Sequence, residues 1–410
     1  MAMGSCSYFE DSRIKKKKLS GRRSSASVVV SILIICFSCF VAFAFGATTA
    51  RLADDEVKAL NGIAESLGKN DWNFSVDPCS GESGWVTPKQ VKGAENAVTC
   101  NCSLPESTFC HVVSIVLKSQ GLPGVLSRNL GKLTYLQEID LSRNYINGTI
   151  PAEWVSLPLV NIALLGNRLS GQIPKEFGNI TTLRNLTLEA NQLSGPLPPE
   201  LGSLLDIESI LISSNNFTGP LPKELAKLTN LKDFRISDNN FTGTLPSFIK
   251  NWTKLKRLAI QASGLEGPIP LEISLLVKLT DMRISDINGT KMEFPPLSNM
   301  TSMKTLILRS CNIIGPLPDY LGEMKSLKTI DLSFNKLSGE IPSTFKEHSS
   351  LKYVYLTGNL LNGSVPYWML KTHRSIDLSY NNFTLRSSGE ATCQLKNVNL
   401  FGSSSLRKNS

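Results

Sequence analysis

Residues 136–151 read LQEIDLSRNYINGTIP, and this stretch decides the fold. Its pattern is LxxLxLxxNxLxGxIP. The apolar positions of LxL alternate with polar ones, which predicts a short strand with one buried face. The pattern occurs twelve times at steps of 24 residues, apart from one step of 23 and a last one of 22. Its Asn position is occupied in turn by Gln120, Asn144, Asn167, Asn191, Asn215, Asn239, Ser263, Ile287, Cys311, Asn335, Asn359 and Asn381.

A single turn of this kind cannot bury its leucine face alone, so successive turns have to stack into one continuous core. Residues 112–386 therefore predict an α/β solenoid, a right-handed leucine-rich repeat superhelix of about 12 repeats. We expect the inward Asn to satisfy backbone groups of adjacent turns, because its amide both donates and accepts. Ser263 and Cys311 can do part of this. Ile287 cannot, so a local distortion is expected around it.

Residues 51–111 precede the repeats and are expected to form a cap over the first leucine face. Residues 54–68, DDEVKALNGIAESLG, read as an amphipathic helix. The inward positions of this helix are Val57, Leu60, Ile63, Ala64 and Leu67. Four cysteines in the cap indicate disulfides rather than a zinc site if the chain is exported, and the sequence leaves all three pairings open. These cysteines are Cys79, Cys100, Cys102 and Cys110.

The two ends of the chain have a different composition. Residues 1–50 read as a signal peptide, because the basic residues 15–23 precede an apolar run over 28–45 and then small residues. The apolar run approaches the length that spans a bilayer, so an uncleaved signal anchor is the alternative. Both readings place residue 51 onward outside the cytoplasm. The polar residues 387–410 read as a flexible C-terminal tail.

Charge and motifs argue against a nucleic-acid-binding protein and against an enzyme. Of the net charge of +9, +5 falls in residues 1–50, which leaves +4 for the rest. Only 3 His are present, so a His-based metal or catalytic centre is not expected. The chain has no phosphate-cradling GxGxxG and no kinase VAIK motif, and HRSIDL at 373–378 falls on repeat positions. We expect no catalysis, no cofactor and no metal.

Twelve N-x-S/T sequons in a chain expected to be exported predict a glycoprotein. The repeat consensus NNFTG accounts for Asn216, Asn240 and Asn382 but not for the others. Each glycan demands an exposed side chain. The predicted glycosylation sites are Asn73, Asn101, Asn147, Asn179, Asn185, Asn216, Asn240, Asn251, Asn288, Asn299, Asn362 and Asn382.

The binding surface is predicted from the spacing. Residues six, four, two and one before the Asn position are expected to face outward on the concave sheet. There, four arginines on adjacent turns can bind a carboxylate, a sulfate or an acidic glycan, and tyrosines suit a contact surface. The alternative is that Arg and Asp of neighbouring strands neutralise one another. The candidate ligand-binding residues are Arg235, Arg257, Arg283, Arg309, Tyr353 and Tyr355.

Four stretches carry a family resemblance: residues 72–85, WNFSVDPCSGESGW; 95–103, ENAVTCNCS; 111–124, HVVSIVLKSQGLPG; and 306–339, LILRSCNIIGPLPDYLGEMKSLKTIDLSFNKLSG. With the LxGxIP ending, they resemble the ectodomain of plant leucine-rich repeat receptor-like serine/threonine kinases, in the subfamily with a malectin-like domain. The resemblance implies the plant-specific repeat type and signalling at the cell surface. It gives this chain no kinase domain, since the chain stops about where the malectin-like domain is expected to begin.

We therefore expect the recognition region of a plant cell-surface receptor-like kinase, facing the extracellular side of the plasma membrane. Its expected partner is a peptide, a glycan or another receptor ectodomain. Membrane association is expected through the N-terminal apolar segment if it is uncleaved, or through a C-terminal span missing from the chain. The alternative function is a secreted inhibitor of a cell-wall-degrading enzyme, similar to the leucine-rich repeat proteins that block polygalacturonases.

Overall fold

The computed structural model describes residues 51–87, 92–103, 109–370, 374–384 and 398–399, all within the unit Ala50–Ser410. The predicted targeting segment, residues 1–50, lies outside the described residues, as does most of the predicted tail. Within that tail, β24 (Val398–Asn399) forms a short strand beside β22 (Ser375–Asp377). The sequence did not predict this strand.

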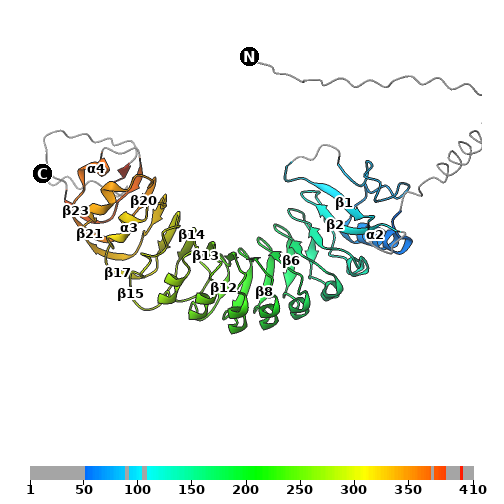
Figure 1. Cartoon of the computed structure of the whole chain (residues 1–410), viewed down its shortest axis with the longest axis horizontal. Coiled ribbons are helices and arrows are strands. Elements are labelled where there is room, and N and C mark those ends of the chain that lie inside the picture. Colours follow the sequence, from blue (N-terminus) through cyan, green and yellow to red (C-terminus); the bar gives the residue numbers. More distant parts are fainter. Residues whose placement is uncertain (1–50, 88–91, 104–108, 371–373, 385–397, 400–410) are drawn as a thin grey trace, which may run out of the picture. The chain divides into compact units, whose positions relative to one another are not determined.

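The unit is a curved stack of turns whose inner side is a single sheet of 14 strands (Figure 1). Neighbouring strands are parallel except for the first pair, which is antiparallel. Residues one repeat apart are direct partners, so Asp233 pairs with Arg257 and Arg257 with Asp281. Together with the repeating turns, this sheet confirms the predicted solenoid. Besides β22 and β24, its strands are β1 (Asn96–Asn101), β2 (His111–Leu117), β3 (Glu138–Asp140), β5 (Asn161–Ala163), β7 (Asn185–Thr187), β9 (Ser209–Leu211), β11 (Asp233–Arg235), β13 (Arg257–Gln261), β14 (Asp281–Ser285), β16 (Thr305–Arg309), β18 (Thr329–Asp331) and β20 (Tyr353–Tyr355).

The convex side consists of short helical turns, which need more room along the stack than strands spaced about 4.8 Å apart. The stack therefore bends toward the sheet, as Figure 1 shows. Eight of the described turns are 3-10 helices and two are single α-helical turns. They are η1 (Arg128–Lys132), η2 (Ala152–Ser156), η3 (Lys175–Asn179), η4 (Pro199–Ser203), η5 (Lys223–Lys227), η6 (Ser247–Asn251), η7 (Leu271–Leu275), α3 (Tyr320–Glu323), η8 (Ser343–Glu347) and α4 (Tyr367–Leu370).

A second set of short strands follows the Asn position of most repeats. These outer strands form two separate sheets of five strands each. The first contains β4 (Asn147–Gly148), β6 (Arg168–Gly171), β8 (Gln192–Gly195), β10 (Asn216–Gly219) and β12 (Asn240–Phe241). The second contains β15 (Met292–Glu293), β17 (Ile313–Pro316), β19 (Lys336–Gly339), β21 (Leu360–Ser364) and β23 (Asn382–Thr384).

The inward Asn side chains join adjacent turns, as predicted. The amide nitrogen of Asn215 donates to the carbonyl of Leu188 in the previous repeat (2.9 Å) and to that of Ile212 in its own (3.2 Å). Its Oδ1 accepts from the backbone nitrogen of Leu193, again in the previous repeat (3.0 Å). The equivalent Asn residues make the same set of bonds. Each Asn therefore satisfies backbone groups that would otherwise be buried without partners.

The series of Asn bridges is interrupted over three consecutive repeats. The Ser263 hydroxyl accepts a bond from the backbone nitrogen of Leu265 in its own repeat, and the Ile287 side chain cannot form a hydrogen bond. The Cys311 thiol lies 3.5 Å from the carbonyl of Ile284 and is fully buried, which raises its pKa to about 12. The outer sheet breaks between β12 and β15, and the segment that follows Ile287 forms no convex helix before α3. The expected local distortion around Ile287 is confirmed.

The cap covers the first repeat as predicted. Helix α2 (Asp54–Leu67) buries Leu60, Ile63, Ala64 and Leu67, while Val57 is partly buried. Of the three pairings that the sequence left open, the structure has Cys79–Cys100 and Cys102–Cys110. Three aromatic rings of the cap pack against one another: those of Trp72 and Phe74 contact that of Trp85, with ring centroids 4.9 and 5.0 Å away.

One cap residue breaks the apolar pattern. Glu56 lies on the buried side of α2, with 3% of its surface exposed. Its Oε2 accepts from the backbone nitrogen of Val112 at 2.8 Å, and its Oε1 lies 2.6 Å from Nδ1 of His111. The carboxylate therefore fastens α2 to β2. The backbone of Gly124 also packs closely against the end of α2. A Cβ at this position would lie 2.0 Å from the carbonyl oxygen of Ser66, so a larger residue does not fit.

We predict that Asn215→Ala lowers the free energy of unfolding by about 2 kcal/mol or more, because backbone groups of two turns lose their partners without access to water. Urea denaturation of the purified chain measures this. Asn230→Ala is the matched control, since the Asn230 amide makes two exposed bonds, donating to the Leu205 carbonyl and accepting from the Lys254 ammonium. Equal losses in the two variants would contradict a special role for the inward Asn.

Candidate binding surface

The structure places all six predicted ligand-binding residues on the inner sheet. Arg235, Arg257, Arg283 and Arg309 lie on the four consecutive strands β11, β13, β14 and β16. Tyr353 and Tyr355 lie further along the same sheet, on β20. The alternation of inward and outward residues along each strand explains this placement. The six residues nevertheless fall into two groups with different surroundings.

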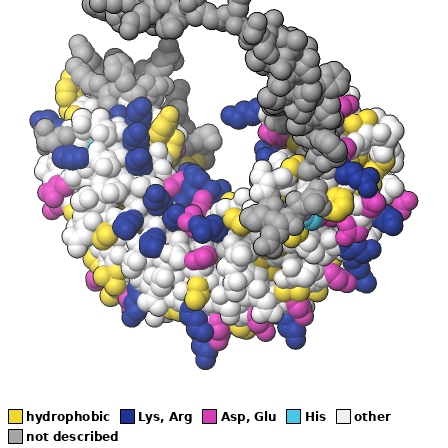
Figure 2. All heavy atoms as spheres, turned by 45° about the vertical axis from the view of Figure 1, so that its right-hand side comes forward, with side chains coloured by type: hydrophobic (Ala, Val, Ile, Leu, Met, Phe, Trp, Pro, Cys, Tyr) yellow, Lys and Arg dark blue, Asp and Glu magenta, His cyan; other side chains and the backbone are white. Residues whose placement is uncertain are grey.

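The first group is a cluster of arginines and aspartates in the middle of the sheet. Arg235 contacts Asp233 through two bonds, of 2.9 and 2.7 Å. Arg283 binds Asp281 in the same bidentate way, at 2.8 and 3.2 Å. Arg257 lies between them, 3.3 Å from a carboxylate oxygen of Asp281 and 3.8 Å from one of Asp233. Figure 2 shows blue and magenta side chains close together in this part of the surface.

These contacts decide between the two sequence interpretations of the arginines. Three of the four guanidinium groups already bind carboxylates of their own sheet, so they are not open to a bidentate anion. The bond to Asp233 also raises the pKa of Arg235, which keeps its charge paired in place. The structure therefore favours mutual neutralisation for Arg235, Arg257 and Arg283.

Glu189, which the sequence analysis did not single out, belongs to the same cluster. It is half-buried two residues before Asn191, and burial raises the pKa of its carboxyl. The charge of Arg235 and a hydrogen bond from Ser213 act in the opposite direction but are weaker than the burial. The sequence does contain a signal for Glu189, because it stands two residues before Asn191, one of the positions expected to face outward on the concave sheet.

The second group is aromatic and lies on the last repeats. Phe334, Tyr353 and Tyr380 are 48%, 47% and 57% exposed, although large apolar rings gain free energy from burial. The guanidinium carbon of Arg309 lies 4.7 Å from the ring centroid of Phe334, so the fourth predicted arginine belongs here. We call this group, Arg309, Phe334, Tyr353, Tyr355 and Tyr380, the aromatic patch.

Two carboxylates flank the aromatic patch. Tyr355 pairs in register with Asp331 on one side and with Asp377 on the other. No Lys or Arg side chain lies within ion-pair distance of either carboxylate among the residues that the structure describes. Asp331 accepts a bond from the backbone nitrogen of Ser333. Asp377 accepts from the backbone nitrogen and the hydroxyl of Ser379 and, at 3.5 Å, from the amide of Asn399. The surface around Tyr355 is therefore aromatic and negatively charged.

The predicted glycosylation sites differ in exposure. All are exposed except Asn101 and Asn185, which are partly buried. The Asn185 side chain lies on the inner sheet and donates to Oδ1 of Asn161 at 2.5 Å. Glycosylation at the twelve positions stays a prediction.

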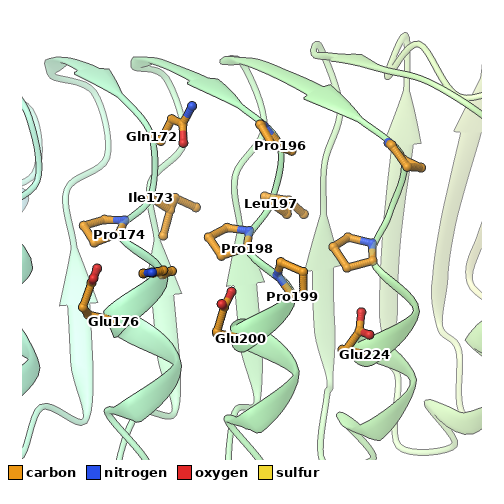
Figure 3. Close-up of a pocket in the computed structure, with 13 residues that line it drawn as sticks. Gln172, Ile173, Pro174, Glu176, Pro196, Leu197, Pro198, Pro199, Glu200 and Glu224 are labelled. Atoms are coloured by element: carbon orange, nitrogen blue, oxygen red, sulfur yellow. The ribbon is translucent and has the colours of Figure 1, made fainter.

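A hollow lies on the flank of repeats three to five (Figure 3). Its lining repeats with the solenoid: Pro174 and Pro198 occupy one repeat position, and Glu176, Glu200 and Glu224 another. Carboxylates one repeat apart recur here because the turns recur, so the hollow follows from the repeat geometry. It contains none of the predicted site residues.

Two features are absent from the described part of the chain. No cluster of three or more His, Cys, Asp or Glu side chains there has the geometry of a metal site. None of the helices in that part combines the length and the apolar character that crossing a membrane requires.

Comparison with known proteins agrees with this geometry. Residues 301–361 match the Leucine rich repeat family, and so do residues 135–157, 182–204 and 230–252. The fold is a leucine-rich repeat solenoid. The matched segments lie on both sides of the interruption around Ile287.

The sequence is similar to part of several plant receptor kinases. A probable leucine-rich repeat receptor-like serine/threonine-protein kinase of Arabidopsis thaliana is 55% identical over 155 residues, which is 37% of this chain and 14% of the relative. A second such kinase from the same plant is 51% identical over 136 residues, 33% of this chain and 13% of the relative. The chain thus matches only a small part of the length of these relatives, and the matches give it no kinase domain.

Solved structures extend the similarity, among them the ectodomain of a plant receptor kinase and a plant peptide hormone receptor. The ectodomain of the Arabidopsis thaliana receptor kinase GASSHO1/SCHENGEN3, in complex with CASPARIAN STRIP INTEGRITY FACTOR 2, is 25% identical, with a TM-score of 0.62 over 81% of this chain and 44% of that one. PEPR1 with AtPEP1 is also 25% identical, with a TM-score of 0.62 over 82% and 49%. The plant peptide hormone receptor RGFR1 with RGF2 is 27% identical, with a TM-score of 0.53 over 66% and 52%.

We predict that Glu189→Gln stabilises the chain at neutral pH. The pKa of Glu189 is higher in the folded state than in the unfolded state, where it has its ordinary value of 4.5. Because the folded state binds this proton more tightly, the free energy of unfolding of wild type decreases as the pH rises from 4.5 through the raised pKa. The stability of the variant relative to wild type should therefore increase over that range and then stay constant. Urea denaturation at a series of pH values measures the difference.

The control for Glu189 is Glu200→Gln, which removes an exposed carboxylate from the convex turn η4. It should leave the pH dependence of stability close to that of wild type. A Glu189→Gln curve that runs parallel to wild type at every pH would show that burial does not act on this carboxyl.

Proposed function

We propose that this chain is the extracellular recognition region of a plant receptor-like kinase and that it binds an extended peptide along its concave sheet. The similarity to receptor kinase sequences and to ectodomains solved with peptide partners supports this proposal. Its mechanism is binding alone: the partner orders on the sheet, and any phosphoryl transfer is done by a domain outside this chain.

The aromatic patch is the observation that carries the proposal. Three of its rings, those of Phe334, Tyr353 and Tyr380, remain exposed on or just beyond the strands of the inner sheet. Aromatic side chains and Arg are the groups that dominate binding energy in protein interfaces. Asp331 and Asp377, on either side of Tyr355, add a site for a cationic side chain. The preferred peptide therefore carries an apolar residue next to Lys or Arg.

Membership of the subfamily with a malectin-like domain, export, glycosylation and residence at the outer face of the plasma membrane are parts of the same proposal. They rest on the sequence features of residues 1–50, on the sequons and on the family resemblance. The alternative, an inhibitor of a cell-wall-degrading enzyme, has no specific structural observation in its favour.

The experiment selects peptides from a random 15-residue library on the immobilised chain. Enriched peptides are then synthesised, and their affinity is measured by calorimetry. Replacing both Tyr353 and Tyr355 by Ala should weaken the binding of these peptides at least tenfold, because two anchor side chains are each worth about 1 kcal/mol or more. The double variant Asp331→Asn, Asp377→Asn should weaken the binding of peptides that contain Lys or Arg more than the binding of peptides that contain neither.

Tyr145→Ala is the matched control, since Tyr145 is also an exposed tyrosine but sits outside the aromatic patch, beside Arg168. The Tyr145→Ala variant should bind the enriched peptides with the same affinity as wild type. If no peptide is enriched, or if the double Tyr variant binds the enriched peptides as wild type does, peptide recognition by the aromatic patch is wrong.

A further inference from the structure

A row of lysines lies where the chain passes from the convex turns into the inner strands of repeats seven to eleven. In these repeats the five residues that run from ten to six before the Asn position are 253–257, 277–281, 301–305, 325–329 and 349–353. All lysines of these segments are exposed. We call them the lysine edge: Lys254, Lys256, Lys278, Lys304, Lys325, Lys328 and Lys352.

The lysines are in register along the solenoid. The backbone nitrogen of Lys328 donates to the carbonyl of Lys304, and that of Lys352 donates to the carbonyl of Lys328, both at 2.8 Å. Lys256 and Lys304 are connected in the same way through Thr280. Parallel strands lie about 4.8 Å apart, so Lys304, Lys328 and Lys352 present one ammonium group per strand spacing.

The lysine edge is not neutralised by the protein itself. None of its seven members lies within 4.0 Å of a carboxylate in the described part of the chain; Lys254 instead bonds to the amide oxygen of Asn230. The one acidic residue in the five segments is Asp281, which Arg257 and Arg283 already bind. This arrangement contrasts with the neighbouring arginine cluster, where each cation has a partner.

The accumulation of charge is local. The equivalent segments of repeats two to five contain the acidic residues Glu138, Asp206 and Glu208 and a single basic residue, Arg184. Repeat six marks the change, because its lysine, Lys232, is paired with Glu208 at 2.7 Å. A row of uncompensated like charges gives a positive potential that attracts anions, and this row runs through five consecutive repeats.

We propose that the lysine edge binds a linear acidic polysaccharide with one carboxylate per sugar. A pyranose ring advances such a chain by nearly one strand spacing, and neighbouring rings turn over about the chain axis. Carboxylates on one side of the chain therefore recur at nearly two strand spacings and can meet alternate lysines. An extended peptide advances about 3.3 Å per residue and alternates its faces, so carboxylates on one side are about 6.6 Å apart and miss the register. Lysine ammonium groups lie on flexible side chains and can bind carboxylates from several directions, which suits a polymer without a fixed conformation.

This surface differs from the aromatic patch, although the two meet at Lys352 and Tyr353. The lysine edge precedes the inner strands, whereas the patch lies mainly on their outward columns. The predicted sequons of Asn251 and Asn299 end at the first residues of two lysine segments, Thr253 and Thr301. Polysaccharide binding therefore goes beyond the proposed peptide recognition, and either can fail without the other. A chain held along the edge leaves the face of the sheet open.

The test measures binding of unesterified polygalacturonate to the glycosylated full chain by calorimetry and co-sedimentation. Replacing Lys304, Lys328 and Lys352 by Glu should weaken binding at least tenfold, and replacing them by Gln should weaken it less. Affinity should rise with oligomer length until the sugar chain spans the five repeats. It should fall as salt is raised, since exposed charges are screened.

The control variant replaces Lys175, Lys223 and Lys250 by Glu, three exposed lysines on convex turns, with the same change in net charge. It should bind as wild type does. Fully methyl-esterified polymer should not bind, because its carboxylates are masked. The proposal is overturned if the lysine-edge and control variants bind equally, if the methyl ester binds as well as the free acid, or if polyglutamate binds more tightly than polygalacturonate.

Discussion

The bond network of one Asn per turn is the constraint on which the rest of the molecule depends. The chain leaves each inner strand in a sharp bend whose backbone groups face the interior, where water cannot reach them. An amide that donates to carbonyls of its own turn and of the previous one, and accepts from a backbone nitrogen of the previous turn, satisfies these groups and fixes the register. The fixed register then places equivalent residues of successive turns side by side.

Register explains why the surfaces of this chain are made of rows. Arg257 lies between aspartates of the two adjacent strands, one strand away on either side, whereas Arg235 and Arg283 bind the aspartate two residues earlier on their own strands. The aromatic patch and the lysine edge also arise from side chains placed in equivalent positions of successive turns. In these two surfaces, however, the neighbouring side chains do not neutralise or cover them. Each surface property is therefore decided by which residue type is repeated at one position, not by a local loop.

Much of this was predictable from the sequence. The spacing of Leu and Asn predicted the repeats, the concave columns and the distortion at Ile287, because these depend on periodicity. It did not predict the pairing of Cys79 with Cys100, since four cysteines allow three pairings. Periodicity also gives no side-chain conformation, so the bidentate bond of Arg283 to Asp281 stayed undecided. The burial of Glu56 was missed because an apolar pattern assigns inward positions to apolar residues.

The break between β12 and β15 has a mechanical consequence. Elsewhere successive turns are joined on both flanks, by the inner sheet and by an outer one, whereas around Ser263 and Ile287 the inner sheet continues and the outer flank keeps only isolated bridges. Resistance to bending is lowest where one of two parallel restraints is weakened. A stiff partner attached to the solenoid on both sides of this point would fix the angle between its halves, and so convert binding into a change of curvature.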